Sequence, residues 1–121
     1  MVARVSRLAE YERLNGKYMR EAEVLLKKKD FPQASEKLWG ACAEIVKAVA
    51  AKRGVELGTH RSLGEFVSRL SREHPRWNLI DSFNYAQSLH QNFYEDWLPA
   101  DHVERGAEVV RDFVEKLRGL L

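Results

Sequence analysis

Apolar side chains recur every three to four positions along most of this chain, a spacing typical of helices that bury one face. The stripes predict five helices, at about residues 6–29, 31–53, 62–74, 77–97 and 101–121. No stretch shows the alternation of β-branched and polar residues that is typical of a strand. The sequence therefore predicts an all-α fold, an antiparallel up-and-down bundle of four to five helices, in one domain spanning residues 1–121.

Short polar segments between the stripes carry signals for the starts and ends of helices. A residue that can cap a helix, followed three positions later by Glu or Gln, is the pattern of a capping box. Three such pairs occur: Asp30 with Gln33, Ser62 with Glu65, and Asp101 with Glu104. Gly54 is placed to end the second helix, because glycine readily adopts the left-handed conformation that often follows a helix.

The second predicted helix is apolar over about half of its circumference. Beside its main stripe lies a second strip, formed by Trp39, Ala43, Val46 and Ala50. This helix is therefore expected to contact neighbours on two sides. The polar residues Glu36, Lys37 and Lys47 flank the second strip, where they line either a cleft or the rim of an interface. Together with the surplus of aromatic residues on the fourth helix, the double stripe predicts a homodimer.

His90 lies in the most aromatic stretch of the chain, residues 82–97, and on the apolar face of the fourth helix. The other members of this stripe are Leu79, Phe83, Ala86, Phe93 and Trp97. One interpretation is a histidine packed in the core and bonded to a neighbour such as Tyr94. The other is a chemically competent group, or a ligand contact, in a cleft. The apolar stripe favours the first interpretation, in which His90 packs in the core.

The composition narrows the class of protein. The 121 residues carry a formal net charge of +2, so only a local basic patch could attract a nucleic acid. Cys42 is the single cysteine; it lies on an inward stripe and is expected to be buried and inert. The four histidines lack metal-ligand spacing, and no glycine-rich phosphate loop occurs. Without a membrane-spanning run or a signal core, a cytoplasmic protein with no membrane partner is expected.

Four basic residues cluster around the loop between the second and third helices: Lys52, Arg53, His60 and Arg61. One interpretation is solvated charge, with Lys52 and Arg53 well placed at the negative end of a helix dipole. The other is a rim that binds phosphate, aided by the positive start of the third helix. The sequence leaves both open.

Two blocks of sequence resemble a known family. The first is Glu-Lys-x-Trp-Gly-Ala within residues 34–41, followed by Lys47 and His60, and the second is Leu-His-x-Asn-Phe-Tyr-Glu at residues 89–95. Together they resemble the archaeal PaREP-type branch of the HEPN (higher eukaryotes and prokaryotes nucleotide-binding) superfamily. The resemblance implies a helical bundle, usually a homodimer. Many HEPN proteins are metal-independent ribonucleases with an Arg-x(4–6)-His motif. Others bind nucleotides or RNA, or partner a minimal nucleotidyltransferase in toxin–antitoxin pairs.

The ribonuclease motif is incomplete here. The positions where its arginine would precede His90 hold Phe83, Asn84 and Tyr85. Without a guanidinium, nothing local would stabilise the charge that builds on phosphorus during cleavage. The expected function is therefore a nucleotide- or RNA-binding module, or the toxin–antitoxin-type partner of a nucleotidyltransferase. The alternatives are a metal-independent ribonuclease with a degenerate motif around His90 and a purely structural dimeric subunit.

The candidate site residues follow from these interpretations. His90 is the candidate catalytic residue. The candidate nucleotide- or RNA-binding residues are Lys37, Lys47, Lys52, Arg53, His60, Arg61, Asn84 and Tyr94. No metal and no cofactor are expected. The expected partners are a second copy of the chain, a nucleotide or RNA, and a nucleotidyltransferase.

Overall fold

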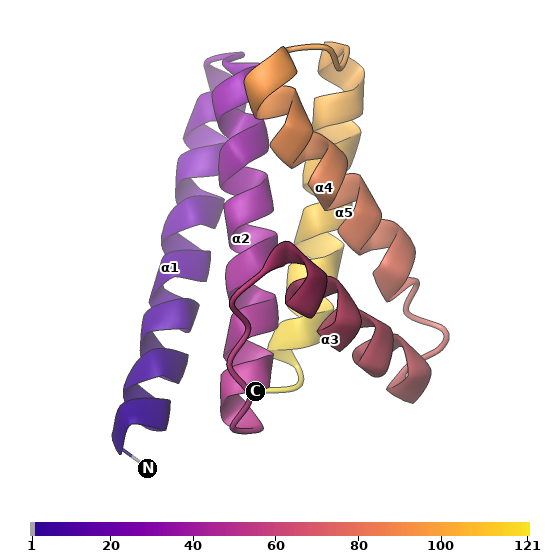
Figure 1. Cartoon of the computed structure of the whole chain (residues 1–121). Coiled ribbons are helices and arrows are strands. Elements are labelled where there is room, and N and C mark those ends of the chain that lie inside the picture. Colours follow the sequence, from indigo (N-terminus) through magenta and orange to yellow (C-terminus); the bar gives the residue numbers. More distant parts are fainter. Residues whose placement is uncertain (1) are drawn as a thin grey trace.

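The computed structural model describes the backbone of residues 2–121 and the side chains of residues 7–121. Five helices account for most of it: α1 Val2–Lys27, α2 Phe31–Lys52, α3 His60–Glu73, α4 Leu79–Glu95 and α5 Ala100–Arg118 (Figure 1). No strand occurs among the residues described, so the predicted all-α bundle is confirmed. Within the same residues, none of the helices combines the length and the apolar character needed to cross a membrane.

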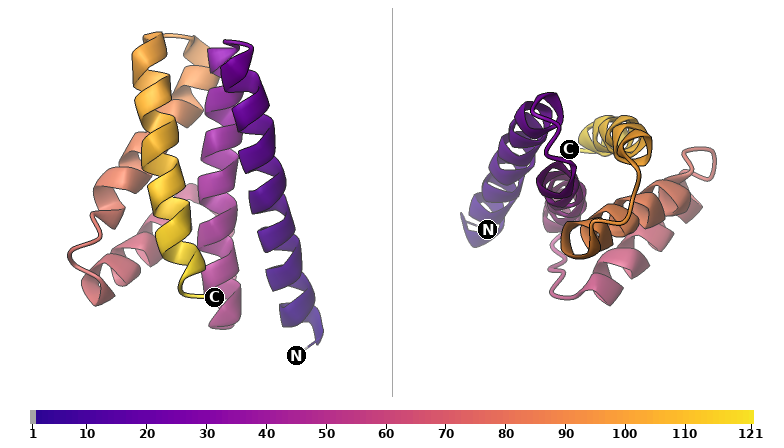
Figure 2. Two further views of the ribbon diagram at one scale, coloured as in Figure 1. Left: turned by 180° about the vertical axis from the view of Figure 1, so that it is seen from behind. Right: turned by 90° about the horizontal axis from the view of Figure 1, so that it is seen from above.

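Helix α2 forms the centre of the molecule. It packs against each of the other four helices, and its pairing with α1 is the most extensive. Seen from above, α1 lies on one side of α2, and α4 and α5 lie on the other, with α3 inclined beneath α4 (Figure 2). The two apolar sides predicted for this helix therefore face two different sets of neighbours.

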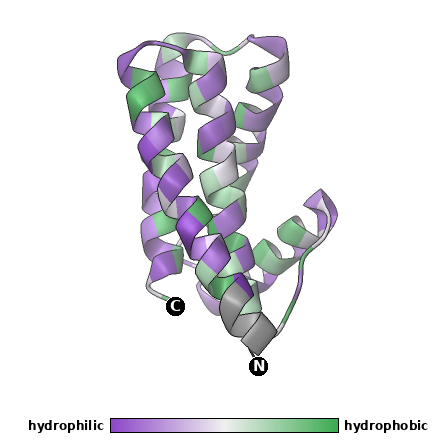
Figure 3. Cartoon of the chain, turned by 90° about the vertical axis from the view of Figure 1, so that its left-hand side faces the viewer, coloured by the Kyte–Doolittle hydropathy of each residue, from purple (hydrophilic) through white to green (hydrophobic). Residues whose placement is uncertain are grey.

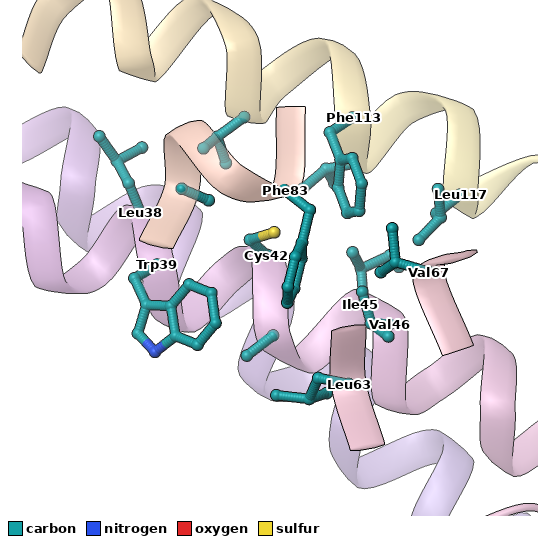
Figure 4. Packing of buried hydrophobic residues seen from close by; sticks show 14 of the residues in the cluster. Leu38, Trp39, Cys42, Ile45, Val46, Leu63, Val67, Phe83, Phe113 and Leu117 are labelled. Atoms are coloured by element: carbon teal, nitrogen blue, oxygen red, sulfur yellow. The ribbon is translucent and has the colours of Figure 1, made fainter. Parts of the chain in front are cut away.

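Side chains from α2, α3, α4 and α5 meet in a common apolar core. Leu38 and Cys42 of α2 lie in this cluster with Phe83 of α4 and Phe113 of α5 (Figure 4). Burying a large apolar side chain of this kind contributes about 1.5–3 kcal/mol to stability. Trp39 stands at the edge of the cluster, where the core gives way to the surface.

A buried amide fastens α1 to the rest of the bundle. On the side of the molecule that α1 forms, hydrophilic and hydrophobic residues are mixed (Figure 3). Asn15 of α1 is nonetheless fully buried, and its side chain donates a hydrogen bond of 2.7 Å to the backbone oxygen of Ala41 in α2. Arg118 of α5 donates a bond of 2.7 Å to the side-chain oxygen of Asn15. One polar residue thus links three helices.

The limits of α2 agree with the sequence signals. Asp30 is the N-cap, and its Oδ1 accepts a hydrogen bond of 3.3 Å from the backbone nitrogen of Gln33. After the C-cap Arg53, Gly54 has φ of 76°, the left-handed conformation expected of a glycine that follows a helix.

The predicted starts of α3 and α5 are wrong. Thr59 caps α3: its hydroxyl accepts from the backbone nitrogen of Ser62 at 2.9 Å, and the Ser62 hydroxyl accepts from the backbone nitrogen of Thr59 at 3.0 Å. The cap therefore lies three positions before the predicted one, because threonine satisfies the same backbone groups earlier. Helix α5 begins at Ala100 after Pro99, and Asp101 lies within its first turn. The first correction matters most, since it places His60 on a helix.

The buried face of α4 also differs from the prediction in its second half. The buried residues are Leu79, Phe83, Ala86, Leu89 and Asn92, whereas the predicted stripe continued through His90, Phe93 and Trp97. Trp97 is 53% exposed. The face shifts because the chain turns sharply at Asp96, where φ is 46°, and Asn92 folds inward to bond the departing backbone. His90 is thereby left at the edge of the core.

Candidate functional site

Three rings from three helices meet where the core reaches the surface. Ring centroids lie 5.2 Å apart for Trp39 and His60, 5.3 Å for Trp39 and His90, and 5.2 Å for the two imidazoles. Trp39 and His60 are stacked, as are His60 and His90, whereas Trp39 and His90 are tilted by 30°; the three rings are here called the ring cluster. Trp39 also packs against Phe83 at 5.6 Å, which anchors the cluster to the core. His60 is exposed to solvent.

A carboxylate orients the imidazole of His90. Its Nδ1 lies 2.7 Å from Oε1 of Glu36, one turn before Trp39 on α2. A carboxylate accepts hydrogen bonds, so Nδ1 is the donor in this contact and the ring is held in one orientation. The His90 side chain is 27% exposed, and the ring of Tyr94 only stands edge-on to it at 5.5 Å. His90 is therefore half-buried beside the core, and the neighbour that its ring nitrogen contacts is Glu36 and not Tyr94.

Two lysines of α2 line the neighbouring surface, each beside a glutamate. The Nζ of Lys37 lies 3.1 Å from Oε1 of Glu21 and 5.2 Å from the centroid of the Tyr18 ring. The Nζ of Lys47 lies 3.5 Å from Oε1 of Glu44. These lysine side chains are 34% and 29% exposed, so both are partly accessible to solvent.

Glu44 is the carboxyl group with the most unusual environment in this region. Burial raises the pKa of Glu44 above its ordinary value, and the charge of Lys47 opposes that shift only in part. Its Oε2 is buried and has no hydrogen-bond partner in the part of the chain that the structure describes.

Three open pockets surround the ring cluster. The first, the α1–α2 pocket, has a volume of about 280 Å³ and is lined by Tyr18, Glu36, Lys37, Trp39, Gly40, Ala43, Glu44, Lys47 and His90. The second, the loop pocket, has about 200 Å³ and is lined by Trp39, Ala43, Lys47, Leu57, Gly58, Thr59, His60 and Leu63. The third, the α3–α4 pocket, has about 390 Å³, and its lining includes His60, Arg61, Phe83, Asn84 and Gln87. Each pocket therefore borders at least one ring of the cluster.

Gly40 determines the shape of the α1–α2 pocket. A Cβ atom at this position would lie only 2.9 Å from Cδ2 of Tyr18, so any other residue would displace that ring. The glycine lets Tyr18 lie directly against α2, where it lines the same pocket as Trp39 and His90.

The basic residues at the end of α2 have structural partners away from the ring cluster. The Nζ of Lys52 donates to the backbone oxygen of the C-terminal Leu121 at 2.5 Å. Arg53 forms a two-point pair with Glu73 at the end of α3, with distances of 2.7 and 2.8 Å. These two side chains tie the end of α2 to α3 and to the C-terminus.

The other predicted residues lie around the rings. Lys37 and Lys47 line the α1–α2 pocket, and Arg61 and Asn84 line the α3–α4 pocket. Tyr94 is 71% exposed and stands beside His90. His60 is itself a member of the ring cluster. The structure thus brings six of the eight predicted binding residues to one surface, together with the candidate catalytic His90.

Sequence reasoning missed the partner of His90 and the stacking of His60. Glu36 and His90 are separated by 54 positions, so no local pattern connects them. A signal for the surface did exist, because Glu36, Trp39 and Ala43 follow one side of α2. The pattern could not show which other helix packs against that side of α2.

Two other chemistries find no support. Cys42 is fully buried, and burial raises the pKa of its thiol far above the usual range, so it cannot act as a nucleophile. Among the described residues, no three His, Cys, Asp or Glu side chains are grouped so as to hold a metal ion.

The arrangement can perform three chemical tasks. Its exposed ring can stack on a planar ligand. Its lysines and Arg61 can pair with phosphate oxygens. Its two adjacent imidazoles, one of them oriented by a carboxylate, are groups of the kind that transfer protons in catalysis.

Comparisons with known proteins agree with this fold. The family model of the archaeal PaREP1/PaREP8 family matches residues 10–114. A crystal structure of a protein from Sulfolobus solfataricus is similar with a TM-score of 0.79 and 23% sequence identity, over 88% of this chain and 95% of that chain. That likeness concerns the fold alone. No curated protein matches the chain.

Proposed function

This chain belongs to the archaeal PaREP1/PaREP8 family, and we propose that it is a nucleotide- or RNA-binding module. The observation that carries the proposal is the ring cluster of Trp39, His60 and His90, with Lys37 and Lys47 in the adjoining pocket. The resemblance to the HEPN superfamily fits the same ligand class.

The chemistry of the surface matches that of a nucleotide. A nucleotide joins a planar base to an anionic phosphate, and stacking of one base on an aromatic ring is worth about 1–3 kcal/mol. His60 offers such a ring, held in place by Trp39 beneath it. Phosphate contacts by lysine add affinity that falls as salt is raised, because bound counterions are released.

Fluorescence anisotropy with a labelled RNA oligonucleotide and with labelled mononucleotides tests this proposal. We expect His60→Ala and Lys37→Ala each to weaken binding by about five- to tenfold, since one removes the stacking ring and the other a phosphate contact. Lys52→Ala is the matched control, because its ammonium group holds the C-terminus. An equal loss in the control, or no binding by the unaltered protein, would reject the site.

A second candidate function, metal-independent cleavage of RNA, is favoured by the second imidazole. His60 lies beside His90, which Glu36 orients. In this proposal Nε2 of His90 accepts the proton of a ribose 2′-hydroxyl, and the 2′-oxygen forms a bond to phosphorus. The bond from phosphorus to the 5′-oxygen breaks, and protonated His60 donates its proton to that leaving oxygen. The products are a 2′,3′-cyclic phosphate and a 5′-hydroxyl.

Cleavage is tested with end-labelled RNA in the presence of a chelator. We expect His60→Ala and His90→Ala each to slow cleavage by about 100-fold or more, with thermal stability close to that of the unaltered protein. Glu36→Gln should slow cleavage less, because it keeps a side chain that can bond Nδ1. RNA that is bound but never converted to the cyclic phosphate would refute this candidate and leave the binding function standing.

The association proposals rest on apolar side chains that the chain leaves uncovered. Val24, Ile80, Tyr94 and Trp97 are 52%, 44%, 71% and 53% exposed. We propose that such surface is covered in a homodimer, with a nucleotidyltransferase as the alternative partner. Sedimentation at micromolar concentration should show a species of twice 14.0 kDa. A single species at the monomer mass would contradict the homodimer, and co-expression with a nucleotidyltransferase would then test the alternative.

A further inference from the structure

The three pockets around the ring cluster adjoin one another. The α1–α2 pocket and the loop pocket share Trp39, Ala43 and Lys47, and the loop pocket shares His60 with the α3–α4 pocket. Two of them, at about 280 and 200 Å³, are smaller than the roughly 300 Å³ at which pockets for drug-sized ligands begin. Neither of these two suits a large compact ligand by itself. A chain of small repeated units could occupy them in succession.

A cationic side chain lines each of these pockets. Lys37 and Lys47 line the α1–α2 pocket, Lys47 also lines the loop pocket, and Arg61 lines the α3–α4 pocket. The Arg61 side chain is 88% exposed, and its Nε lies 3.9 Å from Oε2 of Glu65. An exposed ion pair of this kind is weak, so a phosphate can replace Glu65 as the partner of Arg61 at little cost. Cations that follow one another along a surface match the regularly spaced phosphates of a nucleic-acid strand.

The polar groups between these cations suit the edges of bases. Asn84 and Gln87 of α4 bond each other at 3.3 Å in the α3–α4 pocket and retain further donors and acceptors. Glu36 and Glu44 would repel a phosphate, but Glu36 is bonded to His90 and Glu44 lies beside Lys47. A carboxylate also accepts hydrogen bonds from the amino groups of bases. The surface therefore offers separate places for phosphates and for bases.

We infer that this surface binds a single-stranded oligonucleotide, with one nucleotide in each pocket and the strand crossing the ring cluster where the pockets meet. The inference rests on the proposed function and specifies a polymer as the ligand instead of a free nucleotide. A duplex does not fit, because its bases are already stacked on each other and cannot stack on His60.

A series of labelled single strands of increasing length tests the inference by fluorescence anisotropy. Affinity should rise by about tenfold or more from a mononucleotide to a trinucleotide and level off soon after, because each added base gains a pocket. With about three phosphates engaged, the log–log dependence of affinity on salt should have a slope of about −2. An affinity that does not change with length would overturn the inference while leaving nucleotide binding intact. No binding at any length would instead reject the proposed function.

Variants at the two ends of the surface locate the strand. Lys37→Ala alters the α1–α2 pocket and Arg61→Ala the α3–α4 pocket, and both should weaken binding of a tetranucleotide by about fivefold. A mononucleotide fills one pocket, so it should lose affinity in only one of the two variants. The matched controls are Lys17→Ala, which removes another ammonium group near Glu21, and Arg105→Ala on α5. A tetranucleotide that is weakened by only one end variant would show that the strand does not span the pockets.

Competitors distinguish the ligand classes. A duplex of the same length should compete at least about tenfold less well than the single strand. An acidic peptide of matched charge should compete equally weakly, because it lacks planar groups for the rings. Competition by either at the level of the single strand would overturn the inference. DNA and RNA strands of one sequence then report whether the 2′-hydroxyl is recognised.

Discussion

Asn92 shows what a single buried polar residue does at the end of α4. It is fully buried, and its Oδ1 accepts hydrogen bonds from the backbone nitrogens of Trp97 at 2.8 Å and Leu98 at 2.7 Å. Its Nδ2 donates to the hydroxyl of Ser35 at 3.0 Å. One amide thus accepts from two backbone donors of the segment that follows α4 and joins α4 to Ser35 near the start of α2.

Replacing Asn92 should lower the stability of the fold. Asn92→Ala leaves two backbone donors without a partner, whereas Ser35 keeps its hydrogen bond to the backbone oxygen of Phe31. We expect a loss of about 2–4 kcal/mol in the free energy of unfolding. Urea denaturation measures it. Asn84→Ala on the exposed side of the same helix is the control and should change stability by less than about 0.5 kcal/mol. Equal effects of the two substitutions would show that the buried bonds contribute nothing.

Glu44 gives a prediction about pH. Because burial raises the pKa of this carboxyl, the folded state binds its proton more tightly than the unfolded state. The free energy of unfolding therefore falls as pH rises from the ordinary pKa of glutamate through the raised pKa of Glu44. Glu44→Gln should therefore be more stable than the unaltered protein at pH 7. The advantage should shrink on acidification and vanish below the ordinary pKa of glutamate, as followed by thermal unfolding at several pH values.

Glu10 provides the opposite case as a control. Its hydrogen bond with Arg13 lowers the pKa of Glu10, so its contribution is present at neutral pH and is lost as pH falls. Glu10→Gln should accordingly never stabilise the protein at pH 7. If Glu44→Gln behaved like Glu10→Gln, burial would not dominate the environment of Glu44.

At the scale of elements, α4 and α5 touch where a glycine permits it. A Cβ at Gly106 would lie 2.9 Å from both Cδ atoms of Leu89 and 3.1 Å from Cε1 of Tyr85. Leu89 is fully buried and belongs to the core cluster. The close packing of these two helices therefore depends on the missing side chain.

Two glycine substitutions separate packing from helix propensity. Gly106→Ala should destabilise the protein by about 1–2 kcal/mol, because overpacking outweighs the gain in propensity. Gly16→Ala on α1 should stabilise it by up to about 1 kcal/mol, since the nearest obstacle is the flexible end of Arg20 at 3.2 Å. Chemical denaturation of both variants provides the measurement. A stabilising Gly106→Ala would show that α4 and α5 can separate without cost.

The sequence predicted the positions of the helices better than it predicted which residues each helix buries. Periodicity located five helices and the cap Asp30 confirmed the start of α2, because these features depend on neighbours within one helix. The second half of the α4 stripe failed, because Asn92 became buried through bonds to a segment that follows the helix. The predicted cap of α3 failed because two competing hydroxyl groups lay three positions apart.

At the scale of the whole molecule, α1 and α2 differ in how many neighbours protect them. Helix α2 is covered by all four other helices, whereas α1 packs mainly on α2. A few bonds, such as that of Arg118 with Asn15, join α1 to α5. Helix α1 should therefore open more readily than the rest of the bundle.

Hydrogen exchange followed by NMR or mass spectrometry would show this difference. We expect backbone amides in the middle of α1 to exchange at least about tenfold faster than those in the middle of α2. Asn15→Ala should widen the gap, because it cuts the bonds to Ala41 and to Arg118. Equal protection in the two helices would mean that the molecule opens only as one cooperative unit.

The sequence by itself determined the helical class, the number of helices, the two-sided character of α2 and most residues of the candidate surface. Those features follow from spacing within one helix. Only the tertiary structure decided that Glu36 meets His90, that His60 stacks on Trp39 and that Lys52 and Arg53 are occupied elsewhere. Each of these contacts depends on how one helix is rotated and shifted against another, and that geometry is set by the packing of the whole core.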